Sequence, residues 1–278
     1  MRSLGRFVAL VRYTLRETLS QKIILLLAAV LTVVIGLFVF AISINAANGA
    51  AESVSIYGSK PIASAELPSL IPNLAGVFIV FIFIATVVLC VIATAHIIPE
   101  SLAGGTVVLF LSKPLSRSSI LLARYAGVVL GVAAVQVYFA AGMWIVYSMK
   151  IGAWHPSFLL ICVPLAMSFA ATFAMMAALG VASGSTGLVA AVAFVHVTYL
   201  TEMLARQASS IRSFGEASIP QKIVAAVYYI LPQVSDLRDS ATQILKDQPV
   251  SVSPFMVSIL SSAAMLAVAV TLFRRMDF

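Results

Sequence analysis

Charged residues are scarce in this sequence. Only 10% of its 278 residues are Asp, Glu, Lys or Arg, whereas 62% are hydrophobic. A soluble globular domain carries about 25% charged residues. The chain therefore lacks the polar side chains that cover a water-soluble surface, and its composition predicts a membrane protein.

Cysteine and histidine are rare as well. Cys90 and Cys162 both fall in apolar runs, where a free cysteine packs as a small hydrophobic residue. The 3 histidines stand far apart, so we expect no metal site. The sequence has no GxxxxGK[ST] phosphate-binding loop, and we therefore expect no ATP hydrolysis, no enzymatic activity and no bound cofactor in this chain.

Long apolar runs are what the sequence has instead. A transmembrane helix needs about 20 apolar residues, and backbone groups in lipid must be hydrogen-bonded within their own segment. We predict an all-α integral membrane protein with a single domain over residues 1–278 and six spanning helices. They are Ile23–Ile44, Leu74–Ile98, Ile120–Tyr147, Phe158–Val181, Leu188–Leu204 and Phe255–Phe273.

The basic residues indicate the topology. The formal net charge is +7, and Lys and Arg gather before the first run, between the second and third, and after the sixth. The positive-inside rule makes these segments, and both termini, cytoplasmic. The basic excess is thus explained by topology, and no nucleic-acid partner is expected.

Residues 1–22 predict an amphipathic helix at the cytoplasmic membrane interface. At about 100° per residue, one arc holds Leu4, Phe7, Val8, Val11, Leu15 and Leu19. Four arginines lie away from this arc and are expected to reach lipid headgroups or a partner; a plain topogenic anchor is the alternative. They are Arg2, Arg6, Arg12 and Arg16.

The predicted outer loops differ in character. Asn45–Ile71 is rich in Gly, Ser, Pro and Ala, which indicates irregular structure. Within the loop of residues 205–253, Ile219–Leu231 is apolar but too short to cross a bilayer, so it predicts a re-entrant or interfacial helix. VSDLRDSATQILKD follows as a more polar helix.

The fifth run carries His196, Tyr199, Glu202 and Arg206 at spacings that place them on one helix face. Ionisable groups at membrane depth usually face a protein interior or a wet cavity. His196, Tyr199 and Glu202 are therefore the candidate substrate path, and a structural Glu202–Arg206 pair is the alternative.

Small residues recur four apart in two places. Ala123, Gly127 and Gly131 form one series, and Gly180 and Gly184 form the other. Such spacing lets helix backbones approach closely, so we predict helix packing at these positions.

Residues 99–119 reach the cytoplasmic surface between the second and third runs. Pro99 is expected to end the second helix, and the apolar stretch Thr106–Leu111 is too short to return across the membrane. A short helix under the bilayer that presents polar residues to a cytosolic partner accounts for this pattern. The alternative is a basic loop at the lipid headgroups.

This segment resembles the ABC-2 class of ABC-transporter permeases, in particular the branch with copper-enzyme-maturation and gliding-motility permeases. The segment Leu231–Asp239, LPQVSDLRD, is similar to the LPNxxxF segment before their sixth span, with departures at Gln233 and Leu237. Val107–Phe110 is more apolar than the usual run. The matching residues are Glu100, Gly104, Gly105, Thr106, Ser112, Lys113, Pro114, Ser116 and Arg117.

The resemblance implies a permease subunit of a bacterial cytoplasmic (inner) membrane. It implies a second copy or paralogue, two cytosolic ATPase subunits that bind ATP and magnesium, and an accessory extracytoplasmic protein as a further partner. In that family the segment between spans two and three is a coupling element that docks into the ATPase, so its matching residues are expected to form the ATPase contact here.

Three alternatives stay open. A secondary transporter should place more ionisable residues at mid-membrane, and an intramembrane enzyme needs a convergent catalytic set. A membrane subunit that remodels a partner protein without transport shares every feature above. The substrate, the direction of transport and the choice between homodimer and heterodimer are not encoded in these patterns.

Overall fold

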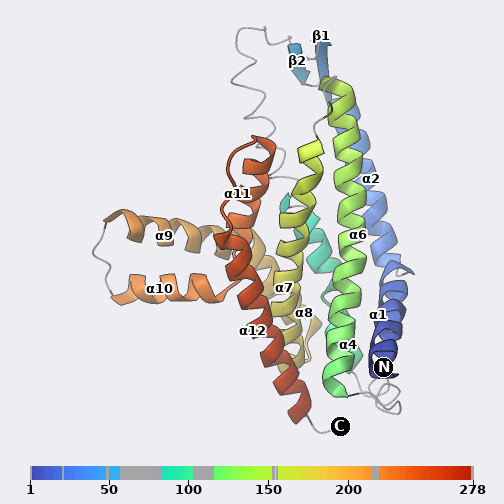
Figure 1. Cartoon of the computed structure of the whole chain (residues 1–278), viewed down its shortest axis with the longest axis vertical. Helices are drawn as coiled ribbons and strands as arrows, with labels where there is room; N and C mark the ends of the chain where they lie inside the picture. Colours follow the sequence, from blue (N-terminus) through green and yellow to red (C-terminus); the bar gives the residue numbers. More distant parts are fainter. Residues whose placement is uncertain are drawn as a thin grey trace.

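The computed structural model describes residues 2–20, 22–47, 50–56, 80, 83–84, 86–102, 116–151, 154, 156–214 and 219–276. These residues form helices and one two-stranded hairpin (Figure 1). The first half contains α1 (Arg2–Ser20), α2 (Lys22–Ala41), β1 (Ile42–Ala47), β2 (Ala50–Ile56), α4 (Ile97–Leu102) and α6 (Arg117–Ile151). The second half contains η1 (Pro156–Ile161), α7 (Cys162–Ser183), α8 (Thr186–Val195), η2 (His196–Leu200), α9 (Thr201–Phe214), α10 (Ile219–Ile230), α11 (Val234–Leu245) and α12 (Ser253–Arg275).

Four described helical segments are long and apolar enough to cross a membrane, or five if the bent pair α1 and α2 counts as one span. The four are Arg117–Met149, Pro156–Ser183, Thr186–Gln207 and Ser253–Arg275. They match predicted runs three to six. The second predicted run, Leu74–Ile98, lies partly outside the described residues, and its described part overlaps the shorter apolar helical stretch Thr86–Glu100. Six spans therefore stay a prediction.

The first predicted outer loop begins with a hairpin, so the expectation of irregular structure is wrong there. The helix ends at Ala41 rather than Ile44, and β1 pairs antiparallel with β2. Ile42 lies opposite Ile56, and Ile44 lies opposite Val54, with serines between them on each strand. Alternating β-branched residues favour a strand over continuation of the helix.

The hydrophobic core is centred on α7, which lies between α6 and α12 in Figure 1. Every residue from Ala171 to Ala178 is buried. Tyr125 of α6 stacks on Phe173 with ring centroids 5.8 Å apart, and its hydroxyl donates to the Ala170 carbonyl at 3.0 Å. An uncharged helix of small and aromatic residues can thus be packed on all sides.

The glycines of α6 are where α1 packs. A Cβ atom added at Gly127 would lie 2.6 Å from the Thr14 Cβ, and one at Gly131 would lie 3.1 Å from the Thr18 Cγ2. The predicted close packing of Gly127 and Gly131 is confirmed. Gly180 likewise packs on Ile98, but Gly184 has nothing within 4 Å and instead ends α7 in the left-handed conformation with φ of 63°.

The face of α1 that packs on α6 overlaps the predicted apolar arc only in part. Leu10, Thr14 and Thr18 are buried, whereas Val8 is 57% exposed. Both threonine hydroxyls donate to carbonyls of their own helix, at 3.0 and 2.8 Å, so the side chains present methyl groups to the glycines. The packed face thus combines small threonines against the glycines with apolar side chains, since Phe7 and Val11 pack on the cluster of Leu10, Ile120 and Ala123.

The helices α9 and α10 form an antiparallel pair that projects sideways from the bundle (Figure 1). The predicted helices over Ile219–Leu231 and after Pro232 are present as α10 and α11, and the re-entrant or interfacial placement of the first stays a prediction. The helix α1 begins, α12 ends and α6 begins at the same end of the molecule (Figure 1).

Candidate functional site

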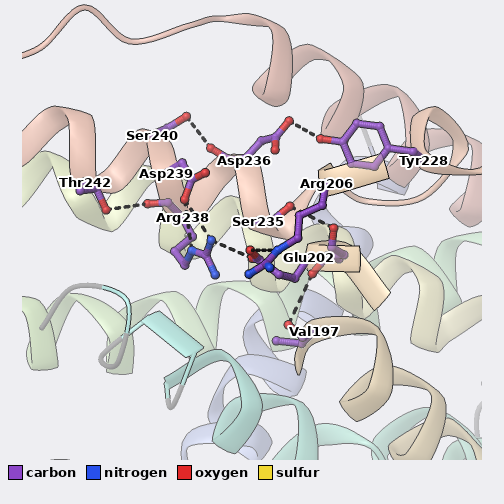
Figure 2. Close-up of polar contacts among 11 residues, drawn as sticks. Val197, Glu202, Arg206, Tyr228, Ser235, Asp236, Arg238, Asp239, Ser240 and Thr242 are labelled. Atoms are coloured by element: carbon purple, nitrogen blue, oxygen red, sulfur yellow. Dashed lines mark hydrogen bonds and ion pairs between the residues drawn. The ribbon is translucent and has the colours of Figure 1, made fainter. Parts of the chain in front are cut away.

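A cluster of charged side chains lies where α9 meets α11 (Figure 2). Glu202, in the first turn of α9, stands between two arginines. Its Oε2 atom is 2.9 Å from Nη2 of Arg238 on α11, and its Oε1 atom accepts a hydrogen bond of 3.2 Å from Nε of Arg206. Arg238 also donates to Oδ1 of Asp239, from Nε at 3.2 Å and from Nη2 at 3.1 Å. Acidic and basic groups therefore alternate through the cluster.

Exposure divides the cluster into a buried part and a solvated part. The side chain of Arg238 is 16% exposed and that of Glu202 is 34% exposed, whereas those of Asp239 and Arg206 are 60% and 78% exposed. Burial lowers the pKa of Arg238, but Asp239 and Glu202 raise it by a larger amount, so its pKa lies above the ordinary value. Arg238 is thus a fixed, largely desolvated positive charge.

Two polar contacts join α11 to neighbouring elements, and a third lies within the helix itself. The Ser235 hydroxyl donates to the Thr201 carbonyl at 3.3 Å, and the Tyr228 hydroxyl at the end of α10 donates to Oδ2 of Asp236 (Figure 2). Ser240 donates to the Asp236 carbonyl at 2.8 Å. Leu237 is fully buried, so α11 packs through this residue, and Arg238 lies at the edge of the packed face.

A cavity of about 370 Å³ opens beside this cluster. Its apolar wall includes Phe83, Ile84 and Val197, and its charged wall is made by Glu202, Arg206 and Arg238. Val80, Thr198, Thr201, Val234 and Ser235 complete the lining. Small-molecule sites are typically apolar clefts of roughly 300–1,000 Å³ with a few placed polar groups, and this cavity has that character.

A π turn positions the cluster. The segment η2, His196–Leu200, is a π-helix between α8 and α9, and the Thr201 N–H donates to the His196 carbonyl five residues earlier. Such turns change the facing of the residues around them and occur frequently at functional sites. Here the turn directs Thr198, Thr201 and Glu202 toward the cavity.

The structure separates the three residues predicted for the substrate path. Glu202 lines the cavity, but His196 is 1% exposed in the interior and Tyr199 is 66% exposed on the outside. The prediction that they share one face is wrong, because it assumed an uninterrupted α-helix across the π turn. The predicted Glu202–Arg206 pair is confirmed.

His196 has unusual surroundings for a polar side chain. Neither ring nitrogen makes a well-directed hydrogen bond to a described residue, although the Pro232 backbone lies beside the ring. An imidazole in such a position acts mainly as a packing group between η2 and the start of α11.

Arg238 and Ser235 belong to the site but were not predicted. The signal in the sequence was weak: Val234, Leu237 and Ala241 repeat at helical spacing and are all buried, which places Arg238 at the edge of the packed face. That pattern predicts which side of α11 is buried, but it does not predict the helix on which α11 packs.

The predicted ATPase contact is only partly described. Gly104, Gly105, Thr106, Ser112, Lys113 and Pro114 lie outside the described residues. Glu100 is exposed near the end of α4. Pro99 lies inside α4 and does not end the helix as predicted; since proline has no N–H, the interruption falls one turn earlier, at Ala95–His96.

The C-terminal end of the predicted ATPase-contact segment is hydrogen-bonded to the end of α12. The Ser116 hydroxyl accepts from the Ser119 N–H at 3.2 Å and caps the start of α6. Arg117 donates to the Met276 carbonyl, and Nε of Arg274 donates to the Ser118 hydroxyl at 2.9 Å. Arg117 therefore makes an intramolecular contact, and its contact with an ATPase stays a prediction.

The N-terminal arginines all belong to α1. Arg12 and Arg16 are exposed, and the side chains of Arg2 and Arg6 lie outside the described residues. On the packed side, Glu17 lies 3.7 Å from Nη2 of the buried Arg124 on α6. This pair adds a charge contact to the glycine–threonine packing of α1.

Comparison of the chain with protein-family models and with curated proteins finds no match. Among the described residues, no group of three or more His, Cys, Asp or Glu side chains is arranged to hold a metal ion.

Proposed function

We propose that this chain is the membrane-spanning permease subunit of an ATP-binding-cassette transporter of the ABC-2 type. It pairs with a second permease copy or paralogue and with two cytosolic ATPase subunits, which supply the energy for export or movement of a substrate. The proposal includes six spans, a bacterial inner membrane and cytoplasmic termini.

The observation that carries the proposal is the motif of residues 100–117. Its first residue, Glu100, is exposed at the end of α4, and its last residues cap α6 and bond to the end of α12. A segment held at both ends by the apolar bundle suits a docking element, because a force applied to it reaches α4, α6 and α12 directly.

The test is a substitution at Glu100 in the complete complex. An exposed acid at a docking surface can form a charge-assisted contact, and truncating one member of such a pair costs about 2–5 kcal/mol when the contact is buried by the partner. We expect Glu100→Ala to reduce copurification of the ATPase, or to uncouple hydrolysis from transport, while the chain still inserts into the membrane.

Asp247→Asn is the control, since Asp247 is also an exposed acid but follows α11, far from α4 along the chain, and asparagine tolerates the left-handed backbone at this position, where φ is 51°. It should leave both measurements unchanged. Wild-type copurification and coupling in Glu100→Ala would remove this residue from the ATPase contact, and failure of the wild-type chain to bind any P-loop ATPase would overturn the proposed function itself.

A further inference from the structure

We propose that Gln136 and Thr86 form a buried site that binds water, and that Phe83 closes this site off from the cavity beside η2. In the proposed transporter, an uncharged hydrogen-bonding group of the transported molecule replaces this water, and only that part of the inference rests on the proposed function. The water site itself requires neither nucleotide nor a partner subunit.

The amide of Gln136 on α6 is completely buried. Its side chain is 0% exposed, and neither Oε1 nor Nε2 makes a hydrogen bond to a described residue. A glutamine amide offers two N–H donors and an acceptor oxygen, and leaving such groups buried without partners is costly. Lipid cannot supply these bonds, so an ordered water or another small hydrogen-bonding group is the partner that the amide requires.

The hydroxyl of Thr86 is buried in the same way. Several buried threonines of this chain donate to the carbonyl four residues earlier, which satisfies the hydroxyl within its own helix. Thr94 donates to the Cys90 carbonyl at 2.8 Å, and Thr172 to the Ser168 carbonyl at 2.8 Å. Thr86 is also 0% exposed, but its hydroxyl makes no hydrogen bond to a described residue. It can therefore serve as a second donor and acceptor for a bound water.

The helix register places the two polar groups at the same depth. Phe83 and Phe139 both line a cavity of about 20 Å³ inside the bundle, so their two helices meet there. Thr86 follows Phe83 by one helical turn, and Gln136 precedes Phe139 by one turn, so each lies on the cavity-facing side of its helix. The helix that carries Thr86 leads to α4, which lies toward the end of the molecule where α6 begins (Figure 1). Since the two helices thus run in opposite directions, both turns lead the same way from the cavity.

The ring of Phe83 stands between the two cavities. It lines both the cavity of about 370 Å³ beside η2 and the cavity of about 20 Å³, and it is only 1% exposed. The small cavity leaves free volume beside the ring, and a shift of the ring would join the two cavities. Phe83 is therefore the side chain that controls access from the outer cavity to the buried site.

The surroundings of the site select an uncharged ligand. Gln136 and Thr86 are neutral, and every described residue that lines the small cavity is apolar. An ion placed there would lose its hydration without gaining an opposite charge, which is costly. Water fits the site, and so does a hydroxyl or amide group of a larger molecule.

The experiment is radiolytic labelling of the purified full-length chain in lipid nanodiscs. A short X-ray pulse converts water to hydroxyl radicals, which modify side chains beside a bound water even when they are buried, and mass spectrometry maps the modified positions. Phe83 and Phe139 are 1% and 2% exposed, and the matched controls on α7, Phe169 and Phe173, are 1% and 0% exposed. We expect the first pair to be modified several-fold faster than the controls. Equal rates for the two pairs would overturn the proposal.

Substitutions test the two polar side chains of the site. Gln136→Leu removes the amide and should lower the labelling of Phe139 to the rate of the α7 controls. Thr86→Val should also reduce this labelling, whereas Thr94→Val should not, because the equally buried Thr94 hydroxyl bonds within its own helix. Unchanged labelling in Gln136→Leu, or equal effects of the two threonine substitutions, would overturn the assignment. If Gln136→Leu does not fold, the threonine pair decides alone.

Phe83→Ala tests the closing role of the ring. Rapid mixing with heavy-oxygen water before the pulse measures how fast bulk water reaches the site, because the heavy isotope then appears in the label on Phe139. We expect Phe83→Ala to accelerate this exchange several-fold. Phe158→Ala is the matched control, since Phe158 lines the small cavity but not the cavity beside η2, and equal exchange in the two variants would overturn the role of Phe83. No ATPase is present in these measurements, so this proposal and the proposed function can fail separately.

Discussion

At the scale of single residues, Arg238 shows why a charge inside the molecule depends on its neighbours. Its guanidinium is largely buried and is compensated by Glu202 and Asp239, of which Glu202 is the less exposed partner. Removing one partner of such a pair leaves the other charge desolvated and uncompensated, whereas removing both charges together avoids that cost.

This argument predicts the outcome of a double-substitution experiment. Arg238→Met should lower the free energy of unfolding by about 1–3 kcal/mol, less than for a fully buried pair because Glu202 is partly solvated. Adding Glu202→Gln should restore part of that loss. Thermal unfolding midpoints in detergent provide the measurement, and a double variant that is less stable than Arg238→Met would contradict the account.

At the scale of elements, the features that the sequence predicted best are those set by residues close together in the chain. The helices α6, α7 and α12 followed from the length of their apolar runs, and the Glu202–Arg206 pair followed from spacing within one helix. The contact between Glu202 and Arg238 joins two helices, so it depends on how α11 packs. The π turn at His196–Leu200 escaped prediction because its apolar composition is that of an ordinary helix, and His196 and Tyr199 were misplaced in consequence.

The close approach of α1 to α6 at Gly127 can be tested by substitution. A Cβ atom at Gly127 would lie 2.6 Å from the Thr14 Cβ and 2.8 Å from its Cγ2, so Gly127→Ala must push the two helices apart. We expect a loss of about 1–3 kcal/mol in the free energy of unfolding, as for other overpacked cores. The unfolding midpoint in detergent measures this loss.

Gly36→Ala is the matched control for that substitution, because Gly36 lies in a helix and has nothing within 4 Å of an added Cβ. It should be neutral or slightly stabilising, since alanine is the better helix former by about 0.8–1 kcal/mol. Thr14→Gly should relieve part of the defect of Gly127→Ala. Equal unfolding midpoints for the two alanine variants would show that α1 does not depend on this close approach.

At the scale of the whole molecule, the chain divides into two working regions. At one end, α1 begins, α12 ends and α6 begins with Arg117, the last residue of the motif of residues 100–117 (Figure 1). Away from that end, η2, α9, α11 and residues 80–84 line the charged cavity. In the proposed transporter, communication between the regions requires that ATP-bound and ATP-free partners contact the motif differently, because a ligand shifts a conformational equilibrium only by its differential affinity.

Native mass spectrometry of the complex purified in mild detergent tests the central claim most directly. The account predicts a particle that contains two copies of this 29.4 kDa chain, or one copy and a paralogue, together with two P-loop ATPase subunits that hydrolyse ATP. A particle that contains this chain without any ATPase, purified under conditions that preserve its function, would contradict the account.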